Sequence, residues 1–306
     1  MTPGYRRGPA HPEALAALAD IAAAGDPDLS TMTPAAARAS RRSRFVSADP
    51  TPVVAIDEFD IVAVATRIYR GSDDVAPALV WLHGGGWVMG GWDTHDEIFR
   101  LLAARTGFHV VAPEYRLAPE HPFPAALEDS LAVINAVACD PERYGVEAGR
   151  LALGGDSAGG NLAAVAALTL APATIGRLAL VYPVTDCRFG TASFREDARH
   201  SYLRPEWLEW FRHHYLTAEA PVDDWRVSPV LASEAQLGAL TDVLVVVASH
   251  DPLRDEGLAF AARVGGAGGR VRTVVAEGFP HGFLSFARRS PAASAYFDTV
   301  TEFLAG

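Results

Sequence analysis

The chain has 306 residues, enough for one large α/β domain with an insertion or for two small domains. Hydrophobic residues make up 49% and charged residues 21%, which are ordinary globular values that exclude a disordered or fibrous chain. The formal net charge of −11 disfavours a nucleic-acid partner, because an acidic surface repels the phosphate backbone.

Two residue types narrow the possible chemistry. The chain contains no lysine, so Schiff-base formation, a Walker-type phosphate lysine and a Ser-Lys dyad are excluded. Cys139 and Cys187 are too few for a disulfide-stapled secreted domain, and we expect both to be reduced. Since no apolar run reaches the ~18 residues of a membrane span, we expect a soluble, cytoplasmic protein without metal, cofactor or membrane partner.

The first half of the chain is predicted to pass from helix to strand. Leu15, Leu18 and Ile21 recur at helical spacing and predict an amphipathic helix over residues 12–24. Helical character continues to about residue 45. Apolar runs then predict strands at Phe59–Ala65, Thr66–Tyr69, Ala78–Leu82 and Val110–Pro113, followed by a helix at Pro124–Val137.

Short apolar strands and helices alternate through most of the second half. Such alternation predicts a mostly parallel sheet with helices on both faces, within a single domain over 1–306. Ligands in sheets of this kind bind at the carboxyl ends of the strands. The predicted strands are Leu151–Leu153, Leu178–Tyr182, Val243–Ala248 and Val271–Ala276, and the predicted helices are Leu162–Leu170 and Pro291–Leu304.

One stretch, from Asp186 to about Arg226, interrupts this alternation. It is rich in aromatic and histidine side chains, and its best helix covers Pro205–Leu216. An insertion between two sheet strands favours a lid or cap over the site. The alternative is a core helix packed on the sheet.

The pentapeptide Gly155-Asp156-Ser157-Ala158-Gly159 fits the pattern G-x-S-x-G. This pattern places a serine on a sharp turn between a strand and a helix, with glycines relieving the crowding. Its Oγ then stands at a helix N-terminus, which favours developing negative charge. The flanking strand and helix are both predicted, so Ser157 is the candidate nucleophile.

The segment His83-Gly84-Gly85-Gly86-Trp87 follows a buried strand. Three successive glycines allow backbone N–H groups to approach a reacting carbonyl closely. Together with the N–H of Ala158, such a loop is expected to stabilise a tetrahedral oxyanion. We expect His83 to shape the loop rather than to act as a base.

Chain order then selects the base and the acid, since the acid and the histidine follow the serine in α/β-hydrolases. His281 lies after the last predicted strand, between glycine and proline turns, and is the candidate base. Asp251 directly follows the strand Val243–Ala248 and is the candidate acid, with Asp186 as its chief rival. The other histidines after the serine are His200, His213, His214 and His250.

With these residues the sequence resembles the hormone-sensitive-lipase-like family, the HGGG-type bacterial family IV esterases of the α/β-hydrolase superfamily. The resemblance covers roughly residue 45 to the C-terminus. It implies an α/β-hydrolase fold with a helical cap formed by about 1–45 and about 186–226. It also implies a triad of Ser157, Asp251 and His281, with oxyanion donors at Gly85, Gly86 and Ala158. The motifs that carry it are His83–Trp87, Tyr115–Glu120, Gly155–Gly160, Asp251–Leu253 and His281–Phe283.

The expected function is therefore that of a serine carboxylesterase acting through an acyl-enzyme intermediate. The resemblance implies short-to-medium acyl esters as substrates and a possible homodimer. Trp87, Trp207 and Phe211 are expected to contact an apolar part of the substrate. The alternatives are an amidase or acyltransferase using the same triad, and a non-catalytic ligand-binding module on the same fold.

Overall fold

The computed structural model describes residues 5, 7–42, 49–171, 174–196 and 201–306. Within them, an eight-stranded sheet has the strand order β1-β2-β4-β3-β5-β6-β7-β8. β2 is antiparallel to both β1 and β4, and all later neighbours are parallel. The strands are β1 Ala55–Ile61, β2 Val64–Arg70, β3 Ala76–Leu82, β4 His109–Pro113, β5 Val146–Asp156, β6 Arg177–Val181, β7 Val243–His250 and β8 Val271–Pro280.

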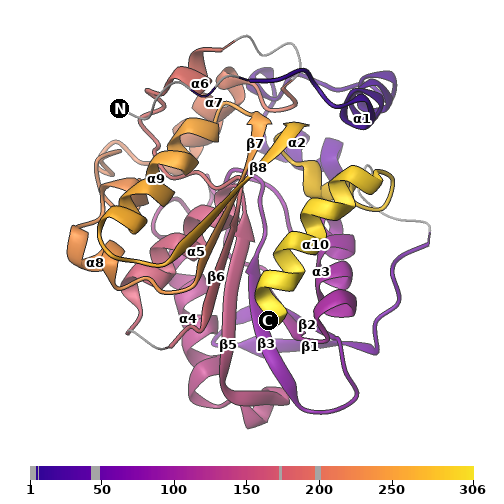
Figure 1. Ribbon diagram of the computed structural model, residues 1–306, viewed down its shortest axis with the longest axis vertical. Coiled ribbons are helices and arrows are strands. Elements are labelled where there is room, and N and C mark those ends of the chain that lie inside the picture. Colours follow the sequence, from indigo (N-terminus) through magenta and orange to yellow (C-terminus); the bar gives the residue numbers. More distant parts are fainter. Residues whose placement is uncertain (1–4, 6, 43–48, 172–173, 197–200) are drawn as a thin grey trace.

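Helices cover both faces of this sheet, as the alternation predicted. In Figure 1, α5 and α9 lie on one face and α3 and α10 on the other. The helices in chain order are α1 Pro12–Ala23, α2 Pro34–Arg42, α3 Trp92–Thr106, α4 Ala125–Cys139, α5 Ala158–Thr169, α6 Ala192–Arg195, α7 Pro205–Tyr215, α8 Glu234–Gly238, α9 Arg254–Gly266 and α10 Pro291–Ala305.

Strand β7 shows why the sequence folds this way. All eight of its residues are buried. Val243, Val245 and Val247 belong to the core cluster under α5 and α9, whereas Leu244 and Val246 belong to the one under α3 and α10. Alternate side chains of the strand therefore pack into the hydrophobic cores on the two faces of the sheet. Each fully buried valine or leucine contributes roughly 1.5–3 kcal/mol by leaving water.

The first hairpin differs from its prediction. The sequence placed a boundary between residues 65 and 66, but β1 and β2 are separated by Val62 and Ala63. Both turn residues have positive φ, 53° and 63°, a conformation that usually selects glycine or asparagine. Val62 is 65% exposed, so an apolar residue at this position does not indicate a buried strand. The predicted boundary is wrong because the turn lacks the usual turn residues.

The other predicted strands and helices are confirmed, several with longer bounds. The helical character expected up to about residue 45 is interrupted between α1 and α2, and residues 43–45 lie outside the described residues. The short strand at Leu151–Leu153 is the middle of the eleven-residue β5, and the helix over residues 12–24 is α1. Helix α3 had no counterpart in the prediction. Pro291–Leu304 corresponds to α10, and Pro205–Leu216 to α7.

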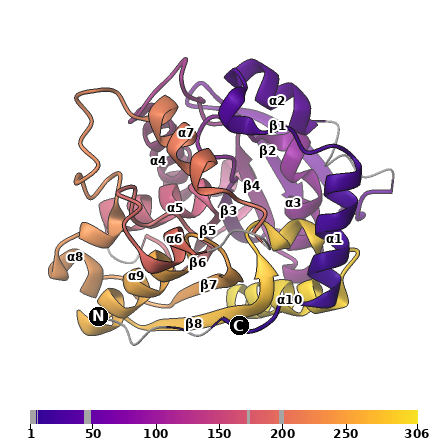
Figure 2. The same ribbon diagram turned by 90° about the horizontal axis from the view of Figure 1, so that it is seen from above.

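Segments from two distant parts of the chain lie together at the end of the sheet to which the arrows of β7 and β8 point (Figure 1). Viewed from above, α6 and α7 lie on one side and α1 and α2 on the other (Figure 2). The Trp207 indole donates to Asp28 Oδ1 at 2.8 Å, and that of Trp210 donates to Met32 O at 3.2 Å. The N-terminal segment and α7 are thus joined by hydrogen bonds.

Two further findings bear on the expectations about environment. Both cysteines are free, with Cys139 exposed and Cys187 buried. Among the described residues, no helix combines the length and the apolarity that crossing a membrane requires.

Candidate active site

The candidate nucleophile sits on a sharp turn between β5 and α5. Ser157 has φ 57° and ψ −118°, an unfavourable conformation for a non-glycine residue. Two backbone bonds hold the turn, because Ser157 N donates to Val181 O at 2.9 Å and Val184 N donates to Ser157 O at 3.2 Å. The chain therefore turns sharply at Ser157, and its Oγ does not continue the line of the strand.

The glycines on either side of the serine lie so close to other backbone atoms that no side chain fits at these positions. A Cβ on Gly155 would lie 2.4 Å from Gly159 O, and a Cβ on Gly159 would lie 1.9 Å from Leu82 O. The turn over Gly155–Gly159, called the nucleophile turn below, thus packs directly on the end of β3. This contact brings Ala158 beside the glycine-rich loop that follows β3.

The structure brings together the three residues proposed as a triad. His281 Nε2 lies 2.9 Å from Ser157 Oγ, and His281 Nδ1 lies 2.7 Å from Asp251 Oδ2. The other oxygen of Asp251, Oδ1, accepts a hydrogen bond from Leu253 N at 2.9 Å. All three residues are less than 10% exposed. This chain of hydrogen bonds spans three different strand ends, those of β5, β7 and β8.

The rival residues have other partners. Asp186 forms an ion pair with Arg188 at 2.7 Å. His250 Nδ1 lies 3.0 Å from Ser249 Oγ, on the far side of the acid loop. His213 and His214 belong to α7, and His200 lies outside the described residues.

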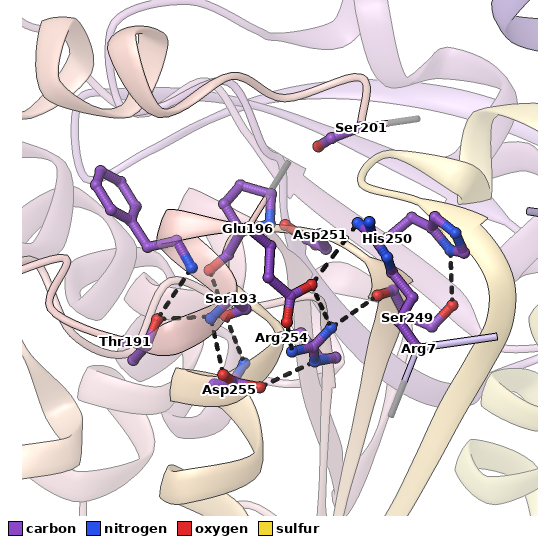
Figure 3. Close-up of polar contacts among 12 residues, drawn as sticks. Arg7, Thr191, Ser193, Glu196, Ser201, Ser249, His250, Asp251, Arg254 and Asp255 are labelled. Atoms are coloured by element: carbon purple, nitrogen blue, oxygen red, sulfur yellow. Dashed lines mark hydrogen bonds and ion pairs between the residues drawn. The ribbon is translucent and has the colours of Figure 1, made fainter. Parts of the chain in front are cut away.

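An ionic network around the buried side chain of Arg254 lies beside the loop that carries Asp251 (Figure 3). The side chain of Arg254 is 1% exposed and donates to Glu196 at 2.6 Å, to Asp255 at 2.9 Å and to Ser249 O at 3.1 Å. Burial alone would lower the pKa of Arg254, but its bonds to Glu196 and Asp255 outweigh burial and raise it. Ser249 Oγ in turn accepts from Gly278 N at 2.8 Å. The network therefore connects the loops that carry the acid and the base.

The candidate oxyanion loop, His83–Trp87, packs against the nucleophile turn, since a Cβ on Gly84 would lie 3.1 Å from Asp156 O. Gly85 and Gly86 have φ of 122° and 62°. Burial, followed by repulsion from His95, lowers the pKa of His83 to about 3, so its imidazole is neutral at physiological pH. Its Nδ1 lies 2.8 Å from Gly84 O. His83 thus bonds within the loop, in agreement with the expectation that it shapes the loop.

Gly86 offers a sharp test of this loop. A Cβ there would lie 2.2 Å from the Phe211 ring, so Gly86→Ala will displace either the loop or α7. We expect kcat to fall about 100-fold, close to the loss of one oxyanion donor. Steady-state hydrolysis of p-nitrophenyl butyrate measures this.

Gly107→Ala is the matched control, because Gly107 has a similar φ of 72° and open space around it. That variant should lose stability but not activity. The double variant Gly86→Ala with Phe211→Ala should regain part of the lost kcat. Full activity in Gly86→Ala would contradict the assignment of this loop.

A cavity that is partly open to solvent is lined by Ser157 and His281. Trp207 and Phe211 line it, as predicted, together with Leu29 and Ile98. Trp87 was expected to contact substrate, but the structure places it elsewhere. It is 1% exposed and stacks on Tyr215 with ring centroids 4.2 Å apart. Its positive φ of 60° turns it away from the cavity and toward α7.

The cavity is also lined by residues to which the sequence analysis gave no role, among them His95, Asp156 and Tyr182. The ring of Tyr182 lies 4.6 Å from that of His281. Asp156 was visible inside the serine pattern but had no assigned role. His95 was missed because α3 was missed, although its sequence position just after the glycine-rich loop was a usable signal.

Comparison with known proteins agrees with this geometry. The α/β-hydrolase fold family model matches residues 79–285. A carboxylic ester hydrolase of Mycobacterium tuberculosis, LipN, is 38% identical over 82% of this chain and 70% of its own. An ethyl acetate hydrolase of Pseudomonas putida is 38% identical over 71% and 70%. The hyperthermophilic esterase of Pyrobaculum calidifontis superposes with a TM-score of 0.91 at 31% identity, over 97% and 98%.

The chain therefore belongs to the hormone-sensitive-lipase-like family of α/β-hydrolases. Within that family it is a carboxylic ester hydrolase that acts on small-molecule esters.

Proposed function

We propose that Ser157, His281 and Asp251 are the catalytic triad of this esterase. The observation that carries the proposal is the continuous chain of hydrogen bonds from Ser157 Oγ through His281 to Asp251. Ser157 Oγ attacks the ester carbonyl carbon while His281 Nε2 takes its proton. Asp251 accepts from Nδ1–H, which fixes the tautomer and stabilises the imidazolium that forms.

The remaining steps complete an acyl transfer. The carbonyl oxygen becomes an oxyanion held by the backbone N–H groups of Gly85, Gly86 and Ala158. His281 then returns its proton to the departing alcohol, leaving an acyl group on Ser157. Water attacks this acyl-enzyme with His281 again as base, which releases the carboxylic acid and restores the serine.

The proposed substrates are esters with short-to-medium acyl chains. Their support is the mostly apolar cavity at Ser157, to whose lining Trp207 and Phe211 contribute. Both side chains come from α7, which is fastened to the N-terminal segment through Asp28 and Met32. We propose that the described parts of about 1–45 and about 186–226 act as one cap.

The test combines a covalent probe with a substrate series. A fluorophosphonate probe should label one residue, Ser157, as located by peptide mapping. Turnover of p-nitrophenyl esters from acetate to laurate should peak at a short or medium chain. Labelling at another residue would contradict the triad, and a maximum at laurate would contradict the proposed substrate range.

The same triad also serves amide hydrolysis and acyl transfer. Parallel assays with matched p-nitroanilides, and with an added alcohol acceptor, separate these alternatives from hydrolysis. We expect ester hydrolysis to dominate, because the family relatives are named as ester hydrolases. Faster turnover of the anilides would favour an amidase instead.

A further inference from the structure

His95 lies between the two backbone segments that carry the proposed oxyanion donors. It belongs to the first turn of α3, which begins five residues after the end of the loop His83–Trp87. Its Nε2 lies 3.2 Å from Gly84 N, in the oxyanion loop, and 3.3 Å from Asp156 Oδ2, in the nucleophile turn. The side chain is 12% exposed, at the edge of the cavity.

The protons on this imidazole follow from its neighbours. Thr94 Oγ1 donates its one hydrogen to Gly91 O at 3.0 Å. It must therefore accept from His95 Nδ1, 2.8 Å away. In the neutral ring Nε2 then has a free lone pair, which accepts from Gly84 N. The same nitrogen lies 3.3 Å from Asp156 Oδ2, so one atom of His95 contacts both segments.

The Asp156 carboxylate that His95 contacts is itself held in place by another hydrogen bond. The Trp81 indole donates to its Oδ1 at 3.1 Å, and the side chain is 6% exposed. Burial would raise the pKa of Asp156, but His95 and Trp81 outweigh burial and hold it below its usual value. The carboxylate is thus charged at neutral pH. It directly precedes the nucleophile Ser157 and the donor Ala158.

The two segments also touch directly. A Cβ on Gly84 would lie 2.5 Å from Asp156 Oδ2 and 3.3 Å from Ser157 Cβ, so the loop has no spare room here. Gly84 leads straight into Gly85 and Gly86. A small shift of Gly84 therefore moves the donors of the loop relative to the donor at Ala158.

We propose that His95 is a positioning residue for ester hydrolysis, which sets the oxyanion loop against the nucleophile turn through Gly84 and Asp156. The inference rests on the proposed function, because it takes Gly85, Gly86 and Ala158 as the oxyanion donors. His95 needs no contact with substrate for this role. It acts by fixing the distance between donors, and misplacing such groups by about 1 Å can cost about 100-fold in rate.

The test compares His95→Leu, which fills the space without polar atoms, with His95→Gln. We expect His95→Leu to lower kcat about 10- to 100-fold with little change in KM. Its affinity for a trifluoromethyl ketone, which forms a tetrahedral adduct on Ser157, should weaken by the same factor as kcat/KM. In His95→Gln the amide oxygen accepts from Gly84 while the amide nitrogen donates to Asp156, so most activity should return.

Exposed His121 provides the control, since His121→Leu should match wild type. The proposal is overturned if His95→Leu keeps wild-type kcat, if its ketone affinity is unchanged, or if His95→Gln is equally impaired. Thermal unfolding reports whether each variant folds. If His95→Leu does not fold, Thr94→Val decides: it removes the acceptor of Nδ1–H and should lower kcat about five-fold at constant KM. Unchanged kcat in Thr94→Val would then overturn the proposal.

The ketone also separates this failure from failure of the proposed function. Wild-type enzyme that the ketone does not inhibit would contradict the triad itself. Wild-type enzyme that is inhibited, alongside an equally inhibited His95→Leu, would contradict only the positioning role.

Discussion

Ser157→Ala will lower kcat for p-nitrophenyl esters by about 10⁶-fold, to the rate that binding and the oxyanion loop sustain alone. The reason is the geometry around Oγ, which lies 2.9 Å from His281 Nε2. The other aliphatic hydroxyls of the described cavity lining, those of Thr94 and Ser285, donate to backbone carbonyls instead. KM for the residual reaction should change little, because the cavity walls are untouched. Single-turnover and steady-state assays measure the loss.

Two controls make this result specific. Ser72→Ala, in a loop far along the chain from the nucleophile turn, should retain wild-type turnover. The fluorophosphonate probe should label Ser72→Ala and leave Ser157→Ala unlabelled. Substantial turnover by folded Ser157→Ala, in a preparation free of contaminating esterase, would remove this serine from the mechanism.

Asp251→Asn is expected to lower kcat by about 10⁴-fold while the protein stays folded. The direction follows from Leu253 N, which donates to Oδ1 at 2.9 Å. An asparagine would keep its oxygen toward Leu253 and turn its NH₂ group toward His281 Nδ1. His281 would then accept at Nδ1 and carry its proton on Nε2, so it could not take the proton of Ser157. The pH profile of kcat measures the change.

Asp186→Asn is the matched control, since Asp186 was the rival acid and pairs with Arg188. That substitution should leave kcat near the wild-type value. If Asp186→Asn lowers kcat strongly and Asp251→Asn lowers it only slightly, Asp186 and not Asp251 is the acid of the triad. Thermal unfolding of both variants shows whether either loss reflects misfolding.

The sequence was most informative where a residue type is required by backbone geometry. The glycines around Ser157 and the three glycines after β3 are needed for close approach, and this need is visible as a pattern. The period of β7 likewise predicts a strand buried on both faces. Chain order then selected the candidate acid and base, which the structure brings within hydrogen-bonding distance.

The sequence was least informative about where side chains point and how elements are placed in the fold. Trp87 stands beside the glycines, yet a positive φ turns its ring onto Tyr215. The turn at Val62 and Ala63 carries no glycine or asparagine, so composition could not reveal it. His95 gains its contacts only from the placement of α3, which no pattern had suggested. Each of these depends on tertiary packing rather than on local preference.

The contact between α7 and the oxyanion loop bears on how enzymes of this design can be altered. Phe211 fills the space that a side chain at Gly86 would need, and Tyr215 of the same helix stacks on Trp87. The helix that contributes Trp207 and Phe211 to the cavity lining therefore also packs against the proposed oxyanion loop. Libraries that diversify α7 to accept new esters will sample slower catalysts far more often than libraries that diversify the Leu29 and Ile98 side of the cavity.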